Sequence, residues 1–340
     1  MRWLITGGAG FIGSNFIFYL LDRYPRDQVI CLDKLTYAAN IETLAPLQSE
    51  KKFTFIAGDI ANKKAVESAF NEHKPDVVVN FAAESHVDRS IKKPSVFLRS
   101  NTFGVQVLLD ACLKFGIPRF HQISTDEVYG DFAKGEEGYF TEKSNLKPSS
   151  PYSASKAAAD LLCGAYFRTY GLYVTVSRCA NNYGAYQFPE KLIPLTILNA
   201  LSDKPVPVYG DGQNVRDWLH VSDHCAAIDL IVQKGEKGGI YNIGGNCEYK
   251  NIDVVKMILA ELGKSENLIR FTKDRKGHDF RYGLDATLLR KKWGWHPQVD
   301  FQQGLARTVR WYLENERWWR AILNKSYQKR NEQVKVNILK

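Results

Sequence analysis

The chain has 340 residues, 44% of them hydrophobic and 24% charged, which indicates a globular protein of one large or two modest domains. No apolar run approaches the length of a membrane span, so we expect no membrane partner. The net charge is +9, but Lys and Arg are spread along the chain, which favours an anionic small substrate over nucleic acid. The six cysteines form no Cys-x-x-Cys pair, and the first predicted strand begins at residue 2. We therefore expect reduced thiols, no leader segment and a cytoplasmic protein.

A glycine-rich turn follows the first predicted strand. Residues 2–6 are apolar, and residues 14–24 have helical periodicity. Between them, Gly7 permits a tight turn, Gly10 lets the backbone approach a pyrophosphate, and Gly13 lets the helix pack closely on the strand. Strand, glycine turn and helix are the context in which a dinucleotide rests its pyrophosphate on a helix amino terminus. The Gly-x-x-Gly-x-x-Gly spacing is typical of short-chain dehydrogenases.

The second predicted strand, residues 28–32, ends at the acidic residue Asp33. A carboxylate about twenty positions past the glycines binds the adenosine ribose and repels a 2′-phosphate, which predicts NAD over NADP. Lys34 follows directly and would soften that preference. Asp59 and Ile60 come after another predicted strand and are placed to flank the adenine. The residues predicted for this part of the cofactor site are Gly7, Gly10, Phe11, Ile12, Gly13, Asp33, Lys34, Thr36, Asp59 and Ile60.

Strands and helices alternate through the first 180 residues. Residues 77–83 form a continuous apolar run, as expected of a strand buried on both faces. Helical patterns cover 96–115 and 152–170, and a further strand is predicted at 172–177. These patterns predict an α/β fold, a Rossmann-type doubly wound parallel sheet with a smaller, interleaved C-terminal substrate domain.

The later part of the chain is less regular. We predict a cofactor domain at 1–180, joined by a strand near 239–245, and a mainly substrate-binding domain at 181–323. A tryptophan-rich helix is predicted from about 305 to 323. Residues 324–340 are polar, and we expect a loose tail there.

Reactive side chains cluster after the predicted strand at 120–124. Thr125, Asp126 and Glu127 come directly after it, at the strand end that faces the ligand crevice of an open α/β sheet. Tyr152 and Lys156 lie four apart on a predicted helix, so they share a face, and the ammonium is expected to lower the pKa of the phenol. Such a phenol can take a proton from a sugar hydroxyl to which Thr125 is also bonded. The alternative is an ordinary turn followed by an ordinary exposed helix pair.

Several long segments resemble a known family. They include 7–13, 33–37, 82–90, 124–130, 152–156, 181–184, 187–194, 209–218 and 274–279. From residue 2 to about 320 the chain resembles the extended short-chain dehydrogenase/reductase group and, within it, the dTDP-glucose 4,6-dehydratases. The adjacent carboxyls of Asp126 and Glu127 are the specific part, because sugar epimerases of the group usually lack them.

The resemblance implies a reaction sequence. Tyr152 deprotonates the C4 hydroxyl of glucose as hydride passes from C4 to NAD. The new ketone acidifies the C5 proton, which Glu127 removes, and Asp126 protonates the C6 hydroxyl, which leaves as water. The hydride then returns to C6, so NAD should stay bound. Two adjacent carboxyls with these roles need pKa values that are pushed apart.

The resemblance also implies ligand contacts and an assembly. The nicotinamide side would be formed by Phe81, Ala82, Ala83, Ser100, Tyr152 and Lys156. The nucleotide-sugar would be bound by Ser85, Thr125, Asn181, Lys191, Leu192, Pro207, Tyr209, Arg216, Asn251, Arg275 and His278. Related enzymes pair the helices that correspond to 96–115 and 152–170 across a four-helix interface, which implies a homodimer.

Three alternatives stay open. A UDP-glucose 4,6-dehydratase would share the same catalytic residues, and several residues that flank the nucleotide site differ from the usual family pattern. An NDP-hexose 4-epimerase would use Asp126 and Glu127 only for structure. A nucleotide-sensing protein on an inactive reductase fold is the third. We expect no metal, because His220 and His224 are joined by no further converging ligand.

Overall fold

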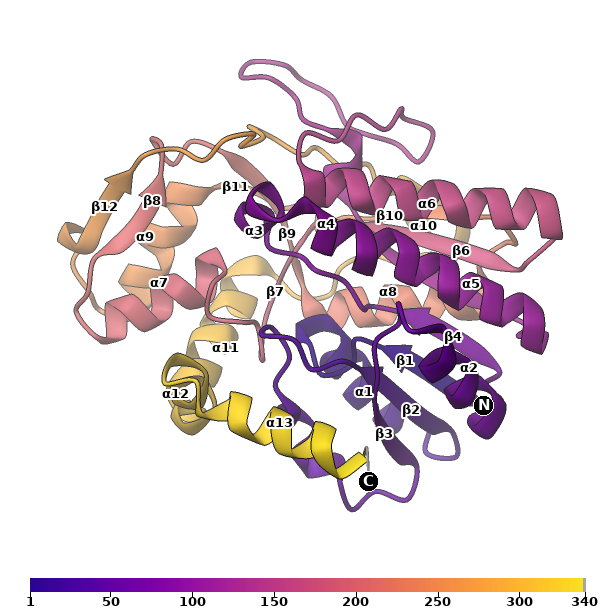
Figure 1. Cartoon of the computed structure of the whole chain (residues 1–340). Helices are drawn as coiled ribbons and strands as arrows, with labels where there is room; N and C mark the ends of the chain where they lie inside the picture. The colour runs from indigo at the N-terminus through magenta and orange to yellow at the C-terminus, as the bar shows by residue number, and fades with distance from the viewer. Residues whose placement is uncertain (339–340) are drawn as a thin grey trace.

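The computed structural model describes residues 1–338, and a parallel sheet of seven strands runs through it (Figure 1). The strand order is β10-β6-β5-β4-β1-β2-β3, and all of its pairings are parallel. This order confirms the predicted doubly wound α/β fold. The strands are β1 (Arg2–Thr6), β2 (Gln28–Asp33), β3 (Phe53–Ala57), β4 (Val77–Asn80), β5 (Phe120–Thr125), β6 (Val174–Cys179) and β10 (Ile240–Ile243).

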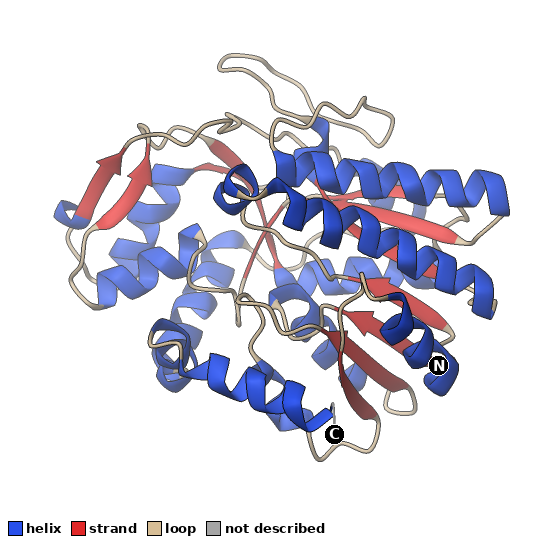
Figure 2. Cartoon of the chain, viewed as in Figure 1, coloured by secondary structure: helices blue, strands red, loops and turns tan. Residues whose placement is uncertain are grey.

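Helices cover both faces of this sheet (Figure 2). On one face α1 packs against α8, and on the other α5 lies between α2 and α6. These helices are α1 (Phe11–Arg23), α2 (Lys63–His73), α5 (Gly104–Phe115), α6 (Pro151–Tyr170) and α8 (Val221–Lys234). Shorter elements are η1 (Ile41–Leu47), α3 (Val87–Lys92), α4 (Pro94–Phe97), the π-helical η2 (Leu98–Phe103), η3 (Asp126–Tyr129) and α10 (Thr287–Trp293).

Strand β1 shows why a central strand of this sheet carries apolar side chains on both faces. Trp3 and Ile5 point into the core shared with α1 and α8, whereas Leu4 points into the core shared with α5 and α6. Successive side chains of a strand alternate between faces, and here both faces are buried. The two cores therefore lie on opposite faces of one sheet. Because its strands are parallel, their carboxyl ends lie along the same edge.

The substrate side is built from smaller sheets and their helices. Strands β11, β9 and β7 form a three-stranded sheet, and β8 pairs with β12. The bounds are β7 (Asn181–Tyr183), α7 (Leu192–Leu201), β8 (Val206–Tyr209), β9 (Val215–His220), β11 (Glu248–Lys250), α9 (Asn251–Glu261), η4 (Glu266–Leu268) and β12 (Ile269–Thr272). Because β10 returns to pair with β6, the chain passes through the large sheet again, as predicted for 239–245.

Several predicted boundaries are wrong. The apolar run at 77–83 leaves the sheet after Asn80, whose side chain bonds Thr6 and Gln122. The strand predicted at 172–177 runs from Val174 to Cys179. The predicted tryptophan-rich helix is two helices, α11 (Phe301–Glu314) and α12 (Glu316–Leu323), because Asn315 is non-helical and its side chain bonds the Trp311 carbonyl.

The polar C-terminal segment is not a loose tail. Residues Ser326–Ile338 form the helix α13, which packs beside β3 and η1 at the edge of the large sheet and is yellow in Figure 1. Tyr327 and Asn331 are buried on it, and Val334 packs against the core of the sheet. The expectation of a loose extension rested on the polarity of this segment. It was wrong because a polar side chain, that of Asn331, is buried in the contact.

Candidate active site

The glycine turn leaves space at the amino terminus of α1. Gly7 has φ +70°, and a Cβ there would lie 2.5 Å from the Ala82 nitrogen. A Cβ on Gly13 would lie 2.4 Å from the Gly7 carbonyl oxygen. Both positions therefore exclude any side chain, and Gly7, Gly10 and Gly13 present their backbone to a cleft. A helix amino terminus with such an exposed backbone is suited to a phosphate group.

Asp33 lies next to this turn at the end of β2. Its carboxylate accepts hydrogen bonds from the backbone nitrogens of Ala9 (3.0 Å) and Leu35 (2.7 Å). Burial raises the pKa of Asp33, while these two backbone bonds lower it. Two of the lone pairs of the carboxylate are used in this way, which leaves acceptor capacity for hydroxyl groups.

One cleft joins the glycine turn to the catalytic residues. It is lined by Gly7, Gly10, Phe11, Ile12, Gly13, Asp33, Lys34, Thr36, Phe81, Ala82, Ala83, Ser85, Thr125, Asp126, Glu127, Tyr152, Lys156, Asn181 and Lys191, all predicted for the site. The structure does not bring three predicted cofactor residues to this lining. Ser100 accepts a hydrogen bond from the Lys34 ammonium at 2.7 Å, Asp59 accepts one from the Ala61 nitrogen at 2.9 Å, and Ile60 packs under Gly104.

The two adjacent carboxyls differ in their surroundings. Asp126 is 2% exposed, and one of its oxygens accepts a hydrogen bond from Thr125 at 3.1 Å while the other has no partner. Burial and the neighbouring Glu127 raise the pKa of Asp126 well above its usual range. The upward shift is stronger for Asp126 than for Glu127, which favours Asp126 as the acid of the pair.

Glu127 faces a group of cations. Burial raises its pKa above the usual range, and the positive charges of Arg275, Lys191 and Arg216 offset part of this rise. The Thr125 hydroxyl also accepts a hydrogen bond from the Glu127 nitrogen at 3.3 Å, so this segment caps a turn as well as presenting reactive groups. A protonated acid beside a more readily ionised one is the arrangement required for paired acid and base catalysis.

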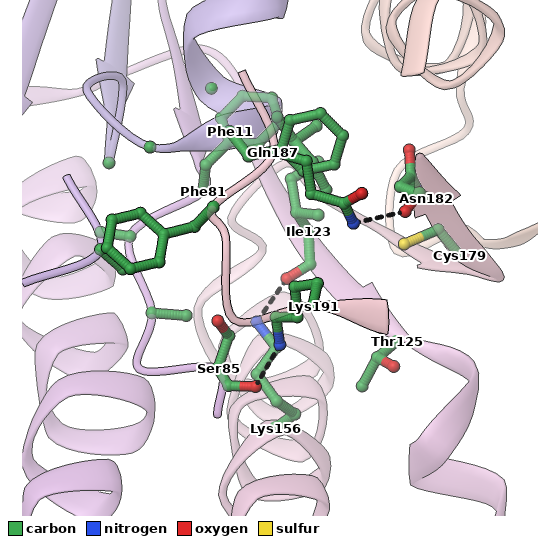
Figure 3. A pocket seen from close by; sticks show the side chains of 18 of the residues that line it. Phe11, Phe81, Ser85, Ile123, Thr125, Lys156, Cys179, Asn182, Gln187 and Lys191 are labelled. Atoms are coloured by element: carbon green, nitrogen blue, oxygen red, sulfur yellow. Dashed lines mark hydrogen bonds between the residues drawn. The ribbon is translucent and has the colours of Figure 1, made fainter. Parts of the chain in front are cut away.

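Tyr152 and Lys156 project from the first turns of α6. Lys156 donates a hydrogen bond to the Ile123 carbonyl at 2.6 Å, as Figure 3 shows. Burial and the charge of Glu127 raise the pKa of Tyr152 well above its ordinary value, and a hydrogen bond with Thr125 lowers it. The predicted lowering of this pKa by Lys156 is therefore wrong for the protein alone.

The predicted substrate residues divide into two groups. Ser85, Thr125, Asn181 and Lys191 line the cleft, and the Lys191 ammonium donates to the Ser85 carbonyl at 3.3 Å (Figure 3). The others lie beyond that lining, on α7, β8, β9, α9 and the segment after β12: Leu192, Pro207, Tyr209, Arg216, Asn251, Arg275 and His278.

Some buried polar atoms of these residues have no protein partner. They are Oδ1 of Asn181, Oδ1 of Asn251 and Nε of Arg275. Buried polar atoms are nearly always bonded, so these three are available to a ligand. Arg216 is less free than predicted, because it donates to the carbonyls of Val215, Asp279 and Phe280.

The site contains residues that sequence reasoning did not assign. Cys179, Asn182, Gln187, Phe188 and Glu190 also line the cleft. Cys179 ends β6, the strand beside β5, so the rule that ligands bind at strand carboxyl ends could have found it. The others lie in or beside segments already matched to the family.

The two histidines considered as metal ligands each bond a neighbouring side chain. His220 bonds Ser222 at 2.7 Å, and His224 bonds Asn182 at 2.9 Å. Burial lowers the pKa of His224 to about 3, so its ring is neutral. Within residues 1–338 no three side chains of metal-ligand type come together, and no helix of that part is long and apolar enough to cross a bilayer.

Comparison with known proteins gives the family. Residues 4–308 match the family described as GDP-mannose 4,6 dehydratase. The chain belongs to this family. Its curated relatives include the dTDP-glucose 4,6-dehydratase of Xanthomonas campestris pv. campestris (strain B100), which is 50% identical over 96% of this chain and 97% of its own length. The dTDP-glucose 4,6-dehydratase of Escherichia coli is 46% identical over 96% of this chain and 98% of its own length.

Solved structures of the family and its neighbours share the fold. The dTDP-glucose 4,6-dehydratase of Streptomyces venezuelae, solved with NAD bound, aligns with a TM-score of 0.91 and 49% identity, over 95% of this chain and 100% of that chain. The UDP-glucose 4-epimerase of Thermus thermophilus, in complex with NAD, aligns with a TM-score of 0.85 and 32% identity, over 93% of this chain and 100% of that chain. The dehydratase resemblance is confirmed.

Proposed function

We propose that the chain is an NAD-dependent dTDP-glucose 4,6-dehydratase, a hydro-lyase that forms the 4-keto-6-deoxy sugar. The observation that carries the proposal is the pair of adjacent carboxyls, Asp126 and Glu127, with their pKa values set by different surroundings. Both line one cleft with Tyr152 and Lys156. An epimerase has no need of an acid and a base at this place, because it removes no water.

The cleft suits NAD. The open turn at Gly7 and Gly13 would hold the pyrophosphate, and Asp33 would accept from the adenosine ribose. When bound, NAD would take a hydride from C4 of the sugar and return it to C6, and its oxidised ring would supply positive charge near Tyr152. The relatives solved with NAD support this cofactor.

Three of the catalytic side chains then transfer protons. Tyr152 takes the proton of the C4 hydroxyl, which Thr125 holds. Glu127, kept ionisable by the surrounding cations, takes the C5 proton that the 4-ketone acidifies and returns a proton to C5 as C6 receives the hydride. Asp126, protonated because it is buried, gives its proton to the departing C6 hydroxyl. Lys156 stays hydrogen-bonded at the Ile123 carbonyl and orients this end of the cleft.

The nucleotide and the division of the chain belong to the same proposal. Residues 1–180 would bind NAD, and residues 181–323 would mainly bind the nucleotide sugar. Asn181, Asn251 and Arg275 have unpartnered buried atoms that a nucleoside diphosphate could use. We favour dTDP over UDP because the curated relatives at 46–50% identity are named for dTDP-glucose.

We also propose a homodimer. Large apolar side chains are exposed on the α4–η2 segment and on α6: Val96 (41%), Leu98 (52%), Phe103 (46%), Leu161 (61%) and Tyr170 (60%). Helix α6 packs against η2, so these side chains belong to neighbouring elements. Sedimentation should find a dimer that Leu161→Glu dissociates, while the control Leu313→Glu on α11, also exposed, should remain dimeric. A monomeric native protein at micromolar concentration would contradict the assembly.

A cytoplasmic location completes the proposal. All six cysteines are free, and five of them are buried. Reduced thiols of this kind persist in a reducing compartment. Localisation of a tagged full-length chain by cell fractionation would test this.

The reaction is tested by competition. The purified protein is given dTDP-glucose and UDP-glucose together, and the products are identified by mass spectrometry. We expect loss of one water from dTDP-glucose, faster than from UDP-glucose. Faster loss of water from UDP-glucose would change only the assigned nucleotide. A product that keeps its C6 oxygen would favour the epimerase.

A further inference from the structure

The last helix of the chain has a buried face. In α13, Tyr327 and Asn331 are each 3% exposed, and Val334 packs against the core of the large sheet. These positions are spaced by four and three residues, so they lie on one side of the helix. The remaining side chains described between them are exposed. A buried polar Asn on a polar helix indicates specific docking.

This face binds the loop that follows β2. The amide nitrogen of Asn331 donates to the Ala39 carbonyl at 2.8 Å, and its oxygen accepts from the Ile41 nitrogen at 3.1 Å. The Tyr327 hydroxyl donates to the Tyr37 carbonyl at 2.5 Å. The Asn331 side chain therefore bonds both a backbone carbonyl and a backbone N–H of the loop, as a neighbouring strand would.

The opposite side of this loop is a wall of the cofactor cleft. Thr36, Ala38 and Ala39 line the cleft beside Asp33. The Asn40 nitrogen donates to the Ala9 carbonyl of the glycine turn at 3.1 Å. The loop is thus held between α13 and the turn that would bind the pyrophosphate.

The loop has a conformation that needs outside support. Leu35 has φ +51°, in the left-handed region that residues other than glycine rarely adopt, and its side chain is buried. Such a backbone persists where surrounding contacts hold it. In addition, the charge of Lys335 on α13 lowers the pKa of Asp33, opposing the effect of burial. Helix α13 therefore supports the wall of the cleft beside Asp33.

We propose that Asn331 and Tyr327 are positioning residues of the cofactor site, which hold the loop at 34–41 against the glycine turn and slow the release of NAD. The inference rests on the proposed function, in which NAD is recycled within one site. Slow release has a direct use there, because NAD lost between turnovers leaves an enzyme that must rebind it.

The test compares Asn331→Ala with Glu332→Ala in the full-length protein. Glu332 is the next residue of α13 and is exposed, so it is a matched control. Release is measured as the exchange of bound NAD for isotopically labelled NAD, followed by mass spectrometry of the extracted protein. Loss of two buried hydrogen bonds should speed release by about 10- to 100-fold in Asn331→Ala. Glu332→Ala should release NAD at the rate of the unchanged protein.

Turnover separates positioning from general damage. At saturating NAD, kcat of Asn331→Ala should match the unchanged protein, while half-maximal activity should require more NAD. If Asn331→Ala does not fold, Tyr327→Phe removes only the hydroxyl bond to Tyr37 and should show a smaller acceleration in the same assay. Unchanged NAD release in the folded variants overturns the inference, as does a loss of kcat that added NAD does not restore. Faster release without any sugar dehydration would support the inference and refute the proposed reaction.

Discussion

The two ends of the cleft differ in how far apart in the sequence their supporting elements lie. At the catalytic end, β5 with its following turn and α6 supply all five reactive side chains within residues 125–156. At the adenosine end, the loop after β2 is bonded by a helix 290 positions later in the chain. We infer that local elements carry the chemistry and remote elements carry the retention of the cofactor. Substitutions at the two ends should therefore fail in different assays.

The largest effect is expected at Tyr152. Tyr152→Phe removes the group that takes the C4 proton, and a general base typically contributes about 10²–10⁴-fold in rate. No reduced cofactor should appear when substrate is mixed with the enzyme, as followed by absorbance. Tyr166→Phe is the control on the same helix, because its hydroxyl bonds Asp110 instead. Rapid formation of reduced cofactor in Tyr152→Phe would assign the proton to another base.

Glu127→Gln should stop the reaction one step later. Oxidation at C4 remains possible because Tyr152, Lys156 and Thr125 are intact, but the C5 proton stays in place. Reduced cofactor should therefore accumulate, and turnover should fall by about 10²–10⁴-fold. Exchange of the C5 proton with solvent deuterium, followed by NMR, should be lost as well. Retained exchange would remove Glu127 from the role of base.

Asp126 should control the alkaline side of the pH profile. Its pKa is raised by burial and by Glu127, and the protonated form is the one that donates to the C6 hydroxyl. Dehydration should therefore decline as the pH rises through this raised pKa, and Asp126→Asn should lower the rate by about 10²-fold or more. In Asp126→Asn, solvent exchange at C5 should continue. A profile whose alkaline limb survives this substitution would contradict the assignment.

The smallest effect is expected at the start of α6. Ser150 is the residue before α6, the helix that carries Tyr152 and Lys156, and it forms a capping box with Ser153 in the first turn. Ser150→Ala should cost about 1 kcal/mol of unfolding free energy, and so should Asn62→Ala at the cap of α2. Denaturant unfolding should find both losses, but only Ser150→Ala should also lower kcat. Equal kcat values in the two variants would show that the cap does not position Tyr152.

Sequence reasoning succeeded where the informative residues are close together. The glycine turn, Asp33 and the Tyr152/Lys156 pair each lie within a few residues of a strand or helix pattern, and all line the cleft. Ser100 lies outside this lining, because η2 turns its side chain toward Lys34. These outcomes depend on which way a side chain points, and hydrophobic periodicity carries no such information.

Two further errors have a common physical origin. The predicted pKa shift of Tyr152 had the wrong sign, because burial and the approach of Glu127 outweigh the lysine four residues away. The prediction of a loose tail at α13 failed because the buried face of this helix includes Asn331, which a hydrophobicity pattern counts as exposed. In both cases burial in the folded chain decides the outcome, and the local spacing of residues does not report it.

The central claim is tested most directly by following one hydrogen. dTDP-glucose labelled with deuterium at C4 is converted by the unchanged enzyme, and the product is examined by NMR. We predict that the deuterium is found at C6 of the 4-keto-6-deoxy sugar. Deuterium lost to solvent, or returned to C4 of a sugar that keeps its C6 oxygen, would contradict the account.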